Sequence, residues 1–487
     1  MKIVLSVVFL LFASNCSKVK VEQTYDPTLG IESAWQSGSP LSGEPLDSWW
    51  KSFKDDELSH IVEQTLNQNR DVYSAAARVE AALVEARIAG NKLSPTVTAN
   101  VGVNRRKQNF IGFPIPGAEN RVLNRTFSTF GASLDVSWEA DFWGRLSSEE
   151  LTTYHYYEVK LAELSALQLS LAAQVSKAWF ACMETLGQVS LAQETVESYR
   201  ESSNAIRSRI KSGELQSYDL RLILGEIAST ESHVQQWKEQ QTRTIRQLEI
   251  LSGLYPSGTL SLGNSLPELP GPVPAGIPSE MIGRRPDLIA GRKRLLAADA
   301  MIAASKAALY PRFRLTNSLG TSSDALQKLL GGDFSVWSLA ANAVQPIFNS
   351  GRLKKEVGLA RIKAKEAMHN HASSVLRALS EVEAALSAES ILNKRFKALR
   401  KAEKESRNAL SLSQLRYKTG VGNSLLLLES KRRLLNIHSQ ILTLQRLRLD
   451  NRVDLHLALG GGLNDFRADS QLENVPKKEK LSLGREK

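Results

Sequence analysis

Two kinds of apolar pattern divide the chain, and the first is a strict alternation. Over Val97–Val103 every second residue is apolar and the residues between are small or polar, and the same period of two recurs over Phe130–Trp138. A period of two places apolar and polar side chains on opposite faces of a β-strand. A less regular version follows in the second half of the sequence. We expect strands at about 94–105, 126–138, 311–320 and 335–345.

The second pattern is helical, and proline sets its limits. The intervals Pro116–Pro256 and Pro346–Pro476 contain no further proline and are rich in strong helix formers. Since proline costs about 3 kcal/mol in a helix interior, both intervals can hold long helices. The first is expected to span Arg145–Lys211, which at about 1.5 Å per residue is roughly 100 Å. Prolines crowd into Pro256–Pro286, which predicts a linker.

The sequence also repeats itself once. Arg78–Ala82 recurs 216 residues later, and both Gly144–Leu146 and Arg209–Gly213 recur 207 residues later. The chain is therefore a tandem duplication. The first half carries nine extra residues between Pro95 and Gly144, where the strands are expected.

Each long helix is expected to end in a tight turn. The two turns are Lys211–Ser217 and Lys418–Ser424. Glycine favours the left-handed backbone that ends a helix, and serine can cap the start of the next one. Because the two turns share one offset, both lie at the same distal end. The candidate tip residues are Gly213, Ser217, Gly420, Val421 and Ser424.

The N-terminus has the order of an export signal. Lys2 precedes the apolar run Ile3–Phe12 and then small residues up to Cys16, which is typical of a signal peptide. The run is shorter than the roughly 20 apolar residues of a membrane-spanning helix. Leu11–Cys16 resembles a bacterial lipobox, so we expect cleavage before an acylated Cys16. Ordinary signal cleavage nearby is the alternative.

These patterns define a domain plan. We expect a signal peptide at 1–15, a lipid-anchored extension at 16–48, a first repeat at 49–255, a proline-rich linker at 256–280, a second repeat at 281–462 and a basic, disordered tail at 463–487. The segment Arg105–Arg125 contains glycine and proline and is expected to form an extracellular loop between two strands.

Composition and motifs exclude several classes of function. The formal net charge of +11 suits nucleic acid, but no zinc spacing, recognition helix or RNA-binding motif accompanies it, so no nucleic-acid partner is expected. No phosphate loop, nucleophile elbow or acid pair is present, so we expect neither an enzyme nor a cofactor. His369 and His371 lie on different faces of a helix, which favours solvated positions over a metal site. Cys182 lies in an apolar stretch and is expected in the core.

Four strands raise a geometric problem. Strands of about ten residues with one apolar and one small polar face suit an outer-membrane barrel, although a soluble hairpin packed on helices gives the same pattern. Even a barrel of about eight strands is filled by its own side chains, so four strands cannot enclose a pore. If these are barrel strands, several chains must pool them, and we expect an oligomer.

A set of short motifs occurs in a fixed order between Trp49 and Gly462. The motifs are Leu66–Asp71, Gly276–Ser279, Arg284–Leu288, Gln345–Phe348, Arg416–Val421 and Leu457–Gly462. Together they resemble the outer-membrane factor family, the TolC-like exit ducts, and most closely its lipoprotein branch that serves RND-type efflux pumps. Each motif is weak alone, and their order within a duplicated chain makes the resemblance specific.

The resemblance implies a mostly α-helical protomer whose four strands are pooled in a homotrimer, giving a twelve-stranded membrane β-barrel continued by a helical periplasmic tunnel. It implies three partners: a periplasmic adaptor protein, an inner-membrane pump of RND type and outer-membrane lipid. It also implies an aperture near the tips, at Tyr417, Leu425 and Glu429. Glu429 would then belong to a ring of three carboxylates. Pairing of Glu429 with Arg432 or Arg433 on a solvated face is the alternative.

We therefore expect an exit duct of the bacterial outer membrane, lipid-anchored and extending into the periplasm. It would pass small molecules, such as drugs, metals or other toxic compounds, from a pump and its adaptor to the exterior. A type I protein-secretion duct of the same fold and a periplasmic coiled-coil scaffold without a pore are the alternatives. The candidate lipobox and Arg284–Asp287 favour efflux over secretion, and the alternating strands favour both ducts over the scaffold.

Overall fold

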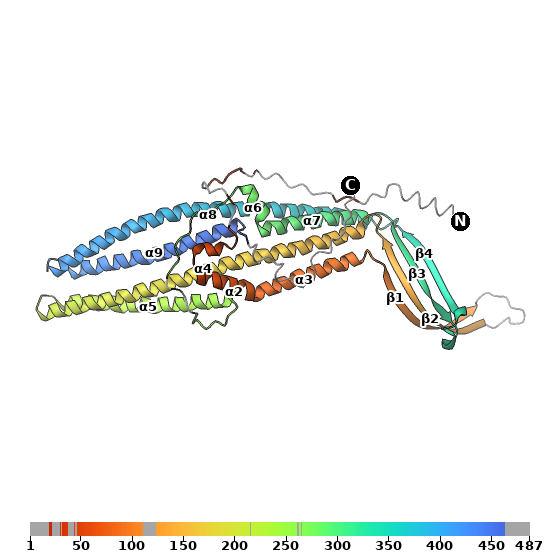
Figure 1. Ribbon diagram of the computed structural model, residues 1–487, viewed down its shortest axis with the longest axis horizontal. Coiled ribbons are helices and arrows are strands. Elements are labelled where there is room, and N and C mark those ends of the chain that lie inside the picture. Colours follow the sequence, from red (N-terminus) through yellow and green to blue (C-terminus); the bar gives the residue numbers. More distant parts are fainter. Residues whose placement is uncertain are drawn as a thin grey trace. The chain divides into compact units, whose positions relative to one another are not determined.

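The computed structural model describes residues 19–21, 30, 32–37, 43, 46–110, 123–214, 216–260, 263 and 265–462 (Figure 1). The expected signal peptide, Cys16 and the tail at 463–487 lie outside this part of the chain. The α-helices are α2 (Asp56–Gln68), α3 (Arg70–Asn91), α4 (Arg145–Lys211), α5 (Ser217–Leu251), α6 (Pro278–Arg284), α7 (Pro286–Ala307), α8 (Arg352–Lys418) and α9 (Ser424–Ala458). Three short 3-10 helices are η1 (Trp49–Phe53), η2 (Leu326–Lys328) and η3 (Gly332–Phe334). None of these described helices combines the length and the apolarity needed to cross a lipid bilayer.

One antiparallel sheet contains β1 (Thr96–Phe110), β2 (Leu123–Ala140), β3 (Arg312–Ser323) and β4 (Ser335–Val344) in sequence order. β1 and β2 pair without a break as far as Phe110 and Leu123. The connection between them, residues 111–122, lies outside the described residues and is shorter than the expected loop. The alternation weakens after Asn104, where Arg105–Gln108 are polar on both faces, so the pattern hid this part of the strand.

The sheet has one apolar face and one polar face. One row of directly opposed residues is Ala99, Leu134, Leu319 and Trp337, and the next row is Thr98, Asp135, Ser318 and Ser338. The apolar row is exposed, with 76% of Trp337 and 61% of Leu319 accessible. On the polar face the Asn100 amide donates to the carboxylate of Asp135. An exposed apolar face is costly in water and suits contact with lipid.

The duplication is reproduced residue for residue in the helices. α4 and α8 each have 67 residues, and α5 and α9 each have 35, at a constant offset of 207. α3 and α7 each have 22 residues at an offset of 216. The nine extra residues of the first half therefore lie between the end of α3 and the start of α4, in the segment that contains β1 and β2.

The chain forms two compact units, and each unit takes segments from both halves of the repeat. The first, here called the strand unit, contains Glu80–Glu158 and Lys293–His369. The second, here called the helical unit, contains Pro27–Val79, Val159–Arg292 and Asn370–Lys487. Across the helical unit the order of helices is α8, α9, α4 and α5 (Figure 1).

A heptad seam joins the two helices of each hairpin. Buried positions in distal α4 recur at spacings of four and three, and partly or fully buried positions recur 207 residues later in α8. The α4 positions are Ala192, Val196, Tyr199, Ser203 and Ile206, and the α8 positions are Leu399, Glu403, Ser406, Leu410 and Ser413. This spacing is that of a left-handed coiled coil. Each hairpin is therefore a two-stranded coiled coil.

Arg285 joins three helices of the helical unit. Its guanidinium donates to both carboxylate oxygens of Asp287 at 3.0 and 2.8 Å, to Glu381 at 2.7 Å and to the backbone oxygen of Ala458 at 3.0 Å. Burial opposes ionisation of Asp287, but the hydrogen bonds and charge of Arg285 outweigh it and hold the pKa of that carboxyl below its usual value. These contacts explain the position of the Arg284–Leu288 motif.

Candidate functional site

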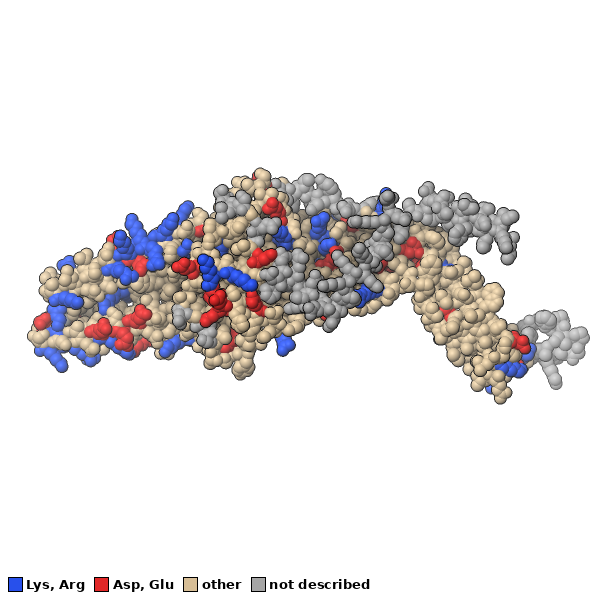
Figure 2. Space-filling model, in the orientation of Figure 1, with Lys and Arg blue, Asp and Glu red and all other residues tan. Residues whose placement is uncertain are grey.

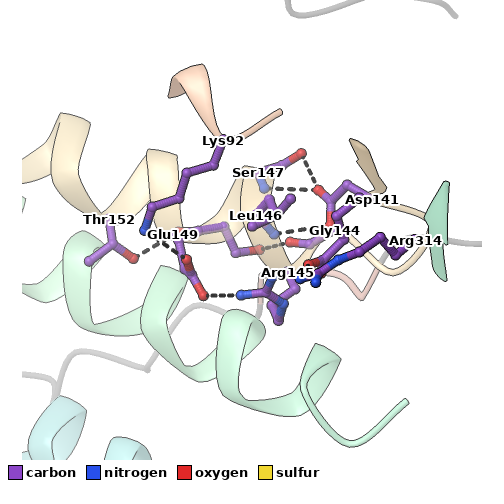
Figure 3. A network of polar contacts seen from close by, with 11 residues as sticks. Lys92, Asp141, Gly144, Arg145, Leu146, Ser147, Glu149, Thr152 and Arg314 are labelled. Atoms are coloured by element: carbon purple, nitrogen blue, oxygen red, sulfur yellow. Dashed lines mark hydrogen bonds and ion pairs between the residues drawn. The ribbon is translucent and has the colours of Figure 1, made fainter. Parts of the chain in front are cut away.

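A polar network fixes the transition from strand to helix in the strand unit (Figure 3). The Asp141 carboxylate accepts hydrogen bonds from the backbone N–H groups of Leu146 and Ser147 at 3.0 and 2.9 Å, and so caps α4. Arg145 donates to Glu139 in β2 and to Glu149 in α4, both at 2.6 Å. The Gly144–Leu146 motif thus holds β2 and α4 in a fixed arrangement.

Aromatic side chains gather at the same transition. The Trp143 ring stacks on Tyr310 with centroids 4.8 Å apart, and its Nε1 donates to the backbone oxygen of Pro311 at 2.9 Å. Phe142 meets Phe313 edge to face at 5.2 Å. Tryptophan and tyrosine are typical of the boundary between lipid and water.

At the distal turns two glycines have the expected left-handed backbone. Gly213 has φ +76° and Gly420 has φ +82°, with open space where a Cβ would lie. The expectation that serines cap the returning helices was wrong. Asn423 caps α9 by accepting from the Leu425 N–H at 2.8 Å, and Gln216 at the start of α5 makes no side-chain cap. Asparagine accepts from the second following residue as readily as serine does, so the sequence alone left the capping residue open.

The structure separates the tip candidates into exposed and buried residues. Ser217 and Val421 are exposed, whereas Ser424 is buried and donates to the carboxylate of Asp219 in α5. Tyr417 is also buried, in a cluster that includes Tyr199 and other apolar residues of all four long helices. Ser424 and Tyr417 therefore lie between the two hairpins.

Leu425 and Glu429 share one exposed face of α9, as expected from their spacing. Glu429 forms an ion pair with Arg432 at 2.6 Å, and both side chains are about half exposed. Within one chain the alternative pairing is thus present, and Arg432 lies beside the carboxylate assigned to the aperture.

Polar contacts between the hairpins were missed by sequence reasoning. Lys431 in α9 donates to the Ser198 backbone and hydroxyl oxygens at 3.1 and 2.9 Å and to the Ser202 hydroxyl at 2.7 Å, both serines lying in α4. Arg209 of α4 donates to the Tyr417 backbone oxygen at 3.0 Å. The recurrence of this arginine in the Arg209–Gly213 repeat was the one available signal.

A second polar cluster lies farther from the tips, between α4 and α9. Glu184 accepts from Thr443 at 2.6 Å and from Arg446, and Arg446 also pairs with Asp450. Burial raises the pKa of Asp450 to about 6, while the charge of Arg446 opposes the rise.

The two hairpins carry opposite charge at equivalent positions. A groove of about 890 Å³ between α4 and α5 is lined by Glu194, Glu197, Glu201 and Glu231. The counterparts of Glu194 and Glu197 in α8 are Lys401 and Lys404. Basic side chains gather over the distal half of α8 (Figure 2). These residues are Lys394, Arg395, Lys397, Arg400, Lys401, Lys404 and Arg407.

Catalytic or metal-binding constellations are not found in the described residues, where no group of three or more His, Cys, Asp or Glu side chains could hold a metal ion. The expectation that His371 is solvated was wrong, because it is buried beside Gly291. Cys182 is a buried free cysteine in the core, as predicted.

The family described as "Outer membrane efflux protein" matches residues 61–254 and 277–461. The chain is a member of this family. The pyoverdine export outer membrane protein OpmQ of Pseudomonas putida is 29% identical, with 91% of this chain and 94% of that protein covered. The outer membrane protein OprJ of Pseudomonas aeruginosa is 30% identical over 94% and 96% of the two chains. The cation efflux system protein CusC of Escherichia coli is 27% identical over 85% and 88%.

Solved outer-membrane channels have the same fold as this efflux protein. The outer-membrane channel OprN matches with a TM-score of 0.83 and 25% identity over 92% of this chain and 100% of that one. The open state of the MtrE channel of Neisseria gonorrhoeae matches with a TM-score of 0.80 and 27% identity over 91% and 98%. The expected family, fold class and exit-duct function in the outer membrane are confirmed. The family is one of efflux channels and not of enzymes, which excludes the scaffold alternative.

Proposed function

We propose that three copies of this efflux protein pool their strands into one barrel. The observation that carries this proposal is the sheet, which has an exposed apolar face, a face of small polar residues and, among the described strands, two edges paired on one side only, β1 and β4. In a four-stranded meander β1 and β4 run antiparallel, so β4 of one copy can continue into β1 of the next. Closure removes unpaired edges, which membrane barrels require.

We propose that the cargo consists of small molecules delivered by a periplasmic adaptor and an RND-type inner-membrane pump. The cargoes named for the relatives OpmQ and CusC, pyoverdine and cations, are small. Protein secretion is the competing function. Gly213, Ser217, Gly420 and Val421, at the distal turns, are the residues proposed to meet the adaptor.

The test combines assembly with transport. Native mass spectrometry of the detergent-purified protein is expected to give a trimer. Co-expression with the neighbouring adaptor and pump in a strain lacking its own exit ducts is expected to raise resistance to small toxic compounds. A monomer in mild detergent would refute pooled strands. Secretion of a co-encoded protein, with no change in resistance, would favour the secretion duct.

We also propose that Cys16 is acylated. The backbone N–H of Val19 donates to the Trp143 oxygen at 3.2 Å, within the aromatic cluster typical of a membrane boundary. Three residues span at most about 11 Å, so an acyl chain on Cys16 would start near that boundary. Mass spectrometry of the mature N-terminus tests this, with Cys16→Ser as the control. An unmodified peptide containing Cys16 from the mature protein would contradict it.

Finally, we propose that Leu425 and Glu429 line the aperture at the tips. Both are exposed on one face of α9, where three copies would place an apolar ring and a charged ring around the axis. Tyr417, which is buried between the hairpins, would act through packing and not by lining the bore.

A further inference from the structure

Every position in the hairpin α4–α5 has a structural counterpart 207 residues later in the hairpin α8–α9. The helices match in length, and each pair is joined by five residues. Any contact that one hairpin makes through a given face can therefore be compared with the same face of the other hairpin.

The comparison shows that one face is covered in α4 and bare in α8. Leu169 of α4 is 3% exposed, but its counterpart Leu376 is 55% exposed. Glu184 is 8% exposed beneath Arg446 of α9, but its counterpart Ile391 is 53% exposed. The difference arises because α4 packs against both α5 and α9, whereas distal α8 packs along a single seam.

We infer that the bare face of α8 packs against α5 of a second copy, in the way that α4 packs against α9 within one copy, and that the tip opens along this seam between copies. This inference rests on the trimer proposed above. It commits to a second copy as the occupant because α5 is the counterpart of α9, the helix that covers the equivalent face of α4. The basic stretch of α8 would then lie near α5, where Glu231 and Glu239 are exposed.

Within one copy, six polar contacts cross the seam between the hairpins. They join Lys177 to Asp454, Glu184 to Arg446, Gln188 to the Ser439 oxygen, Ser198 and Ser202 to Lys431, Arg209 to the Tyr417 oxygen, and Asp219 to Ser424. With them in place, the hairpins of one copy are expected to move together.

Most counterparts of these contacts have lost the necessary groups. The counterpart pairs between copies are Ala384 with Gln247, Ile391 with Glu239, Arg395 with the Ser232 oxygen, Glu405 and Ala409 with Leu224, Arg416 with the Ile210 oxygen, and Leu426 with Ser217. Only the arginines at 395 and 416 can donate to a facing backbone oxygen. The seam between copies therefore has fewer polar contacts than the seam within a copy, and it separates first.

The test uses two matched cysteine pairs and a short bismaleimide crosslinker. Leu224→Cys with Ala409→Cys lies across the proposed seam, and Ser202→Cys with Lys431→Cys is its counterpart within one copy. Burial raises the pKa of the Cys182 thiol to about 11, so this native cysteine remains unreactive. Denaturing gels are expected to give covalent trimers for the first pair and monomers of altered mobility for the second. Single-cysteine variants should give neither.

Opening events in planar bilayers, recorded before and after crosslinking, complete the test. Crosslinking the first pair should cause loss of opening, and crosslinking the second should leave opening unchanged. A trimer by native mass spectrometry with no covalent trimer on the gel would refute the helix pairing while leaving the proposed duct intact. Loss of opening with the second pair alone would refute the assignment of the opening seam. A monomer by native mass spectrometry would instead refute the trimer itself.

Discussion

The guanidinium of Arg209 lies 5.0 Å over the ring of Tyr417 and donates a 3.0 Å hydrogen bond to the backbone oxygen of the same residue. Glu214 holds the Arg209 Nε at 2.9 Å and so fixes the side chain. One arginine thus joins the last turns of α4 and α8 through both a hydrogen bond and a cation–π contact.

Arg209→Ala is expected to loosen the tips. A hydrogen bond from a charged donor contributes about 1.5–3 kcal/mol, which is roughly a tenfold or greater rise in local opening. Hydrogen exchange of the backbone amides in the last turns of α4 and α8 measures this effect. Arg207→Ala, on an exposed position of the same helix, is the control and should leave exchange unchanged. Equal exchange in both variants would remove Arg209 from this role.

The aperture can be tested through charge. Glu429→Gln should weaken the preference for cations, and Arg432→Gln should strengthen it, because Arg432 partly neutralises the carboxylate at 2.6 Å. Leu425→Ala should raise single-channel conductance by removing an apolar ring. Reversal potentials and conductance in planar bilayers give both quantities. Unchanged selectivity in both charge variants would place Glu429 away from the bore.

The two faces of the sheet make opposite predictions for adjacent residues. Leu319→Lys places a charge on the apolar face, where lipid contact makes it cost about 2–4 kcal/mol. Ser318→Lys places the same charge on the polar face and should be tolerated. Heat-modifiable mobility of outer-membrane fractions on gels measures assembly. Normal assembly of Leu319→Lys, with failure of Ser318→Lys, would invert the assignment of the faces.

Much of this fold follows from patterns that are local in sequence. Long helices need only the absence of proline, and the alternation near Val97 and Phe130 is visible within ten residues. The contacts between hairpins depend on partners far apart in the chain. Glu184 and Arg446, for instance, are 262 residues apart, and neither residue type indicates the other.

The tips show a second limit of sequence reasoning. Tyr417 and Leu425 are both apolar and lie close to the same turn, yet one is buried and the other exposed. Their environments are decided by how four helices pack together, which a pattern along one helix does not specify.

Asp450 is expected to make stability depend on pH. Its pKa is about 6 in the folded protein, and an unfolded aspartate has a pKa near 3.9. Between these values the folded state binds more protons than the unfolded state, so this group's contribution to stability falls as pH rises from about 4 to 6. Asp450→Asn stays neutral and should be more stable than the wild type at pH 7, by up to about 3 kcal/mol.

Thermal unfolding followed by circular dichroism at pH 4 and pH 7 measures this difference, which should vanish at the lower pH. Asp454→Asn, on the same helix but more exposed, is the control. Lower stability of Asp450→Asn at pH 7 would mean that the ion pair with Arg446 outweighs burial.

The equal lengths of α4 and α8, and of α5 and α9, restrict how this protein can change in evolution. A deletion confined to one helix would put its tip out of level with its counterpart and rotate the heptad seam away from its partner. Only whole heptads, removed from both helices of both hairpins, preserve the seam and the level of the tips, and each such step changes the reach by about 10 Å. The distance spanned by these hairpins is thus a quantity counted in heptads, and relatives adapted to a different spacing should differ by coordinated multiples of seven residues.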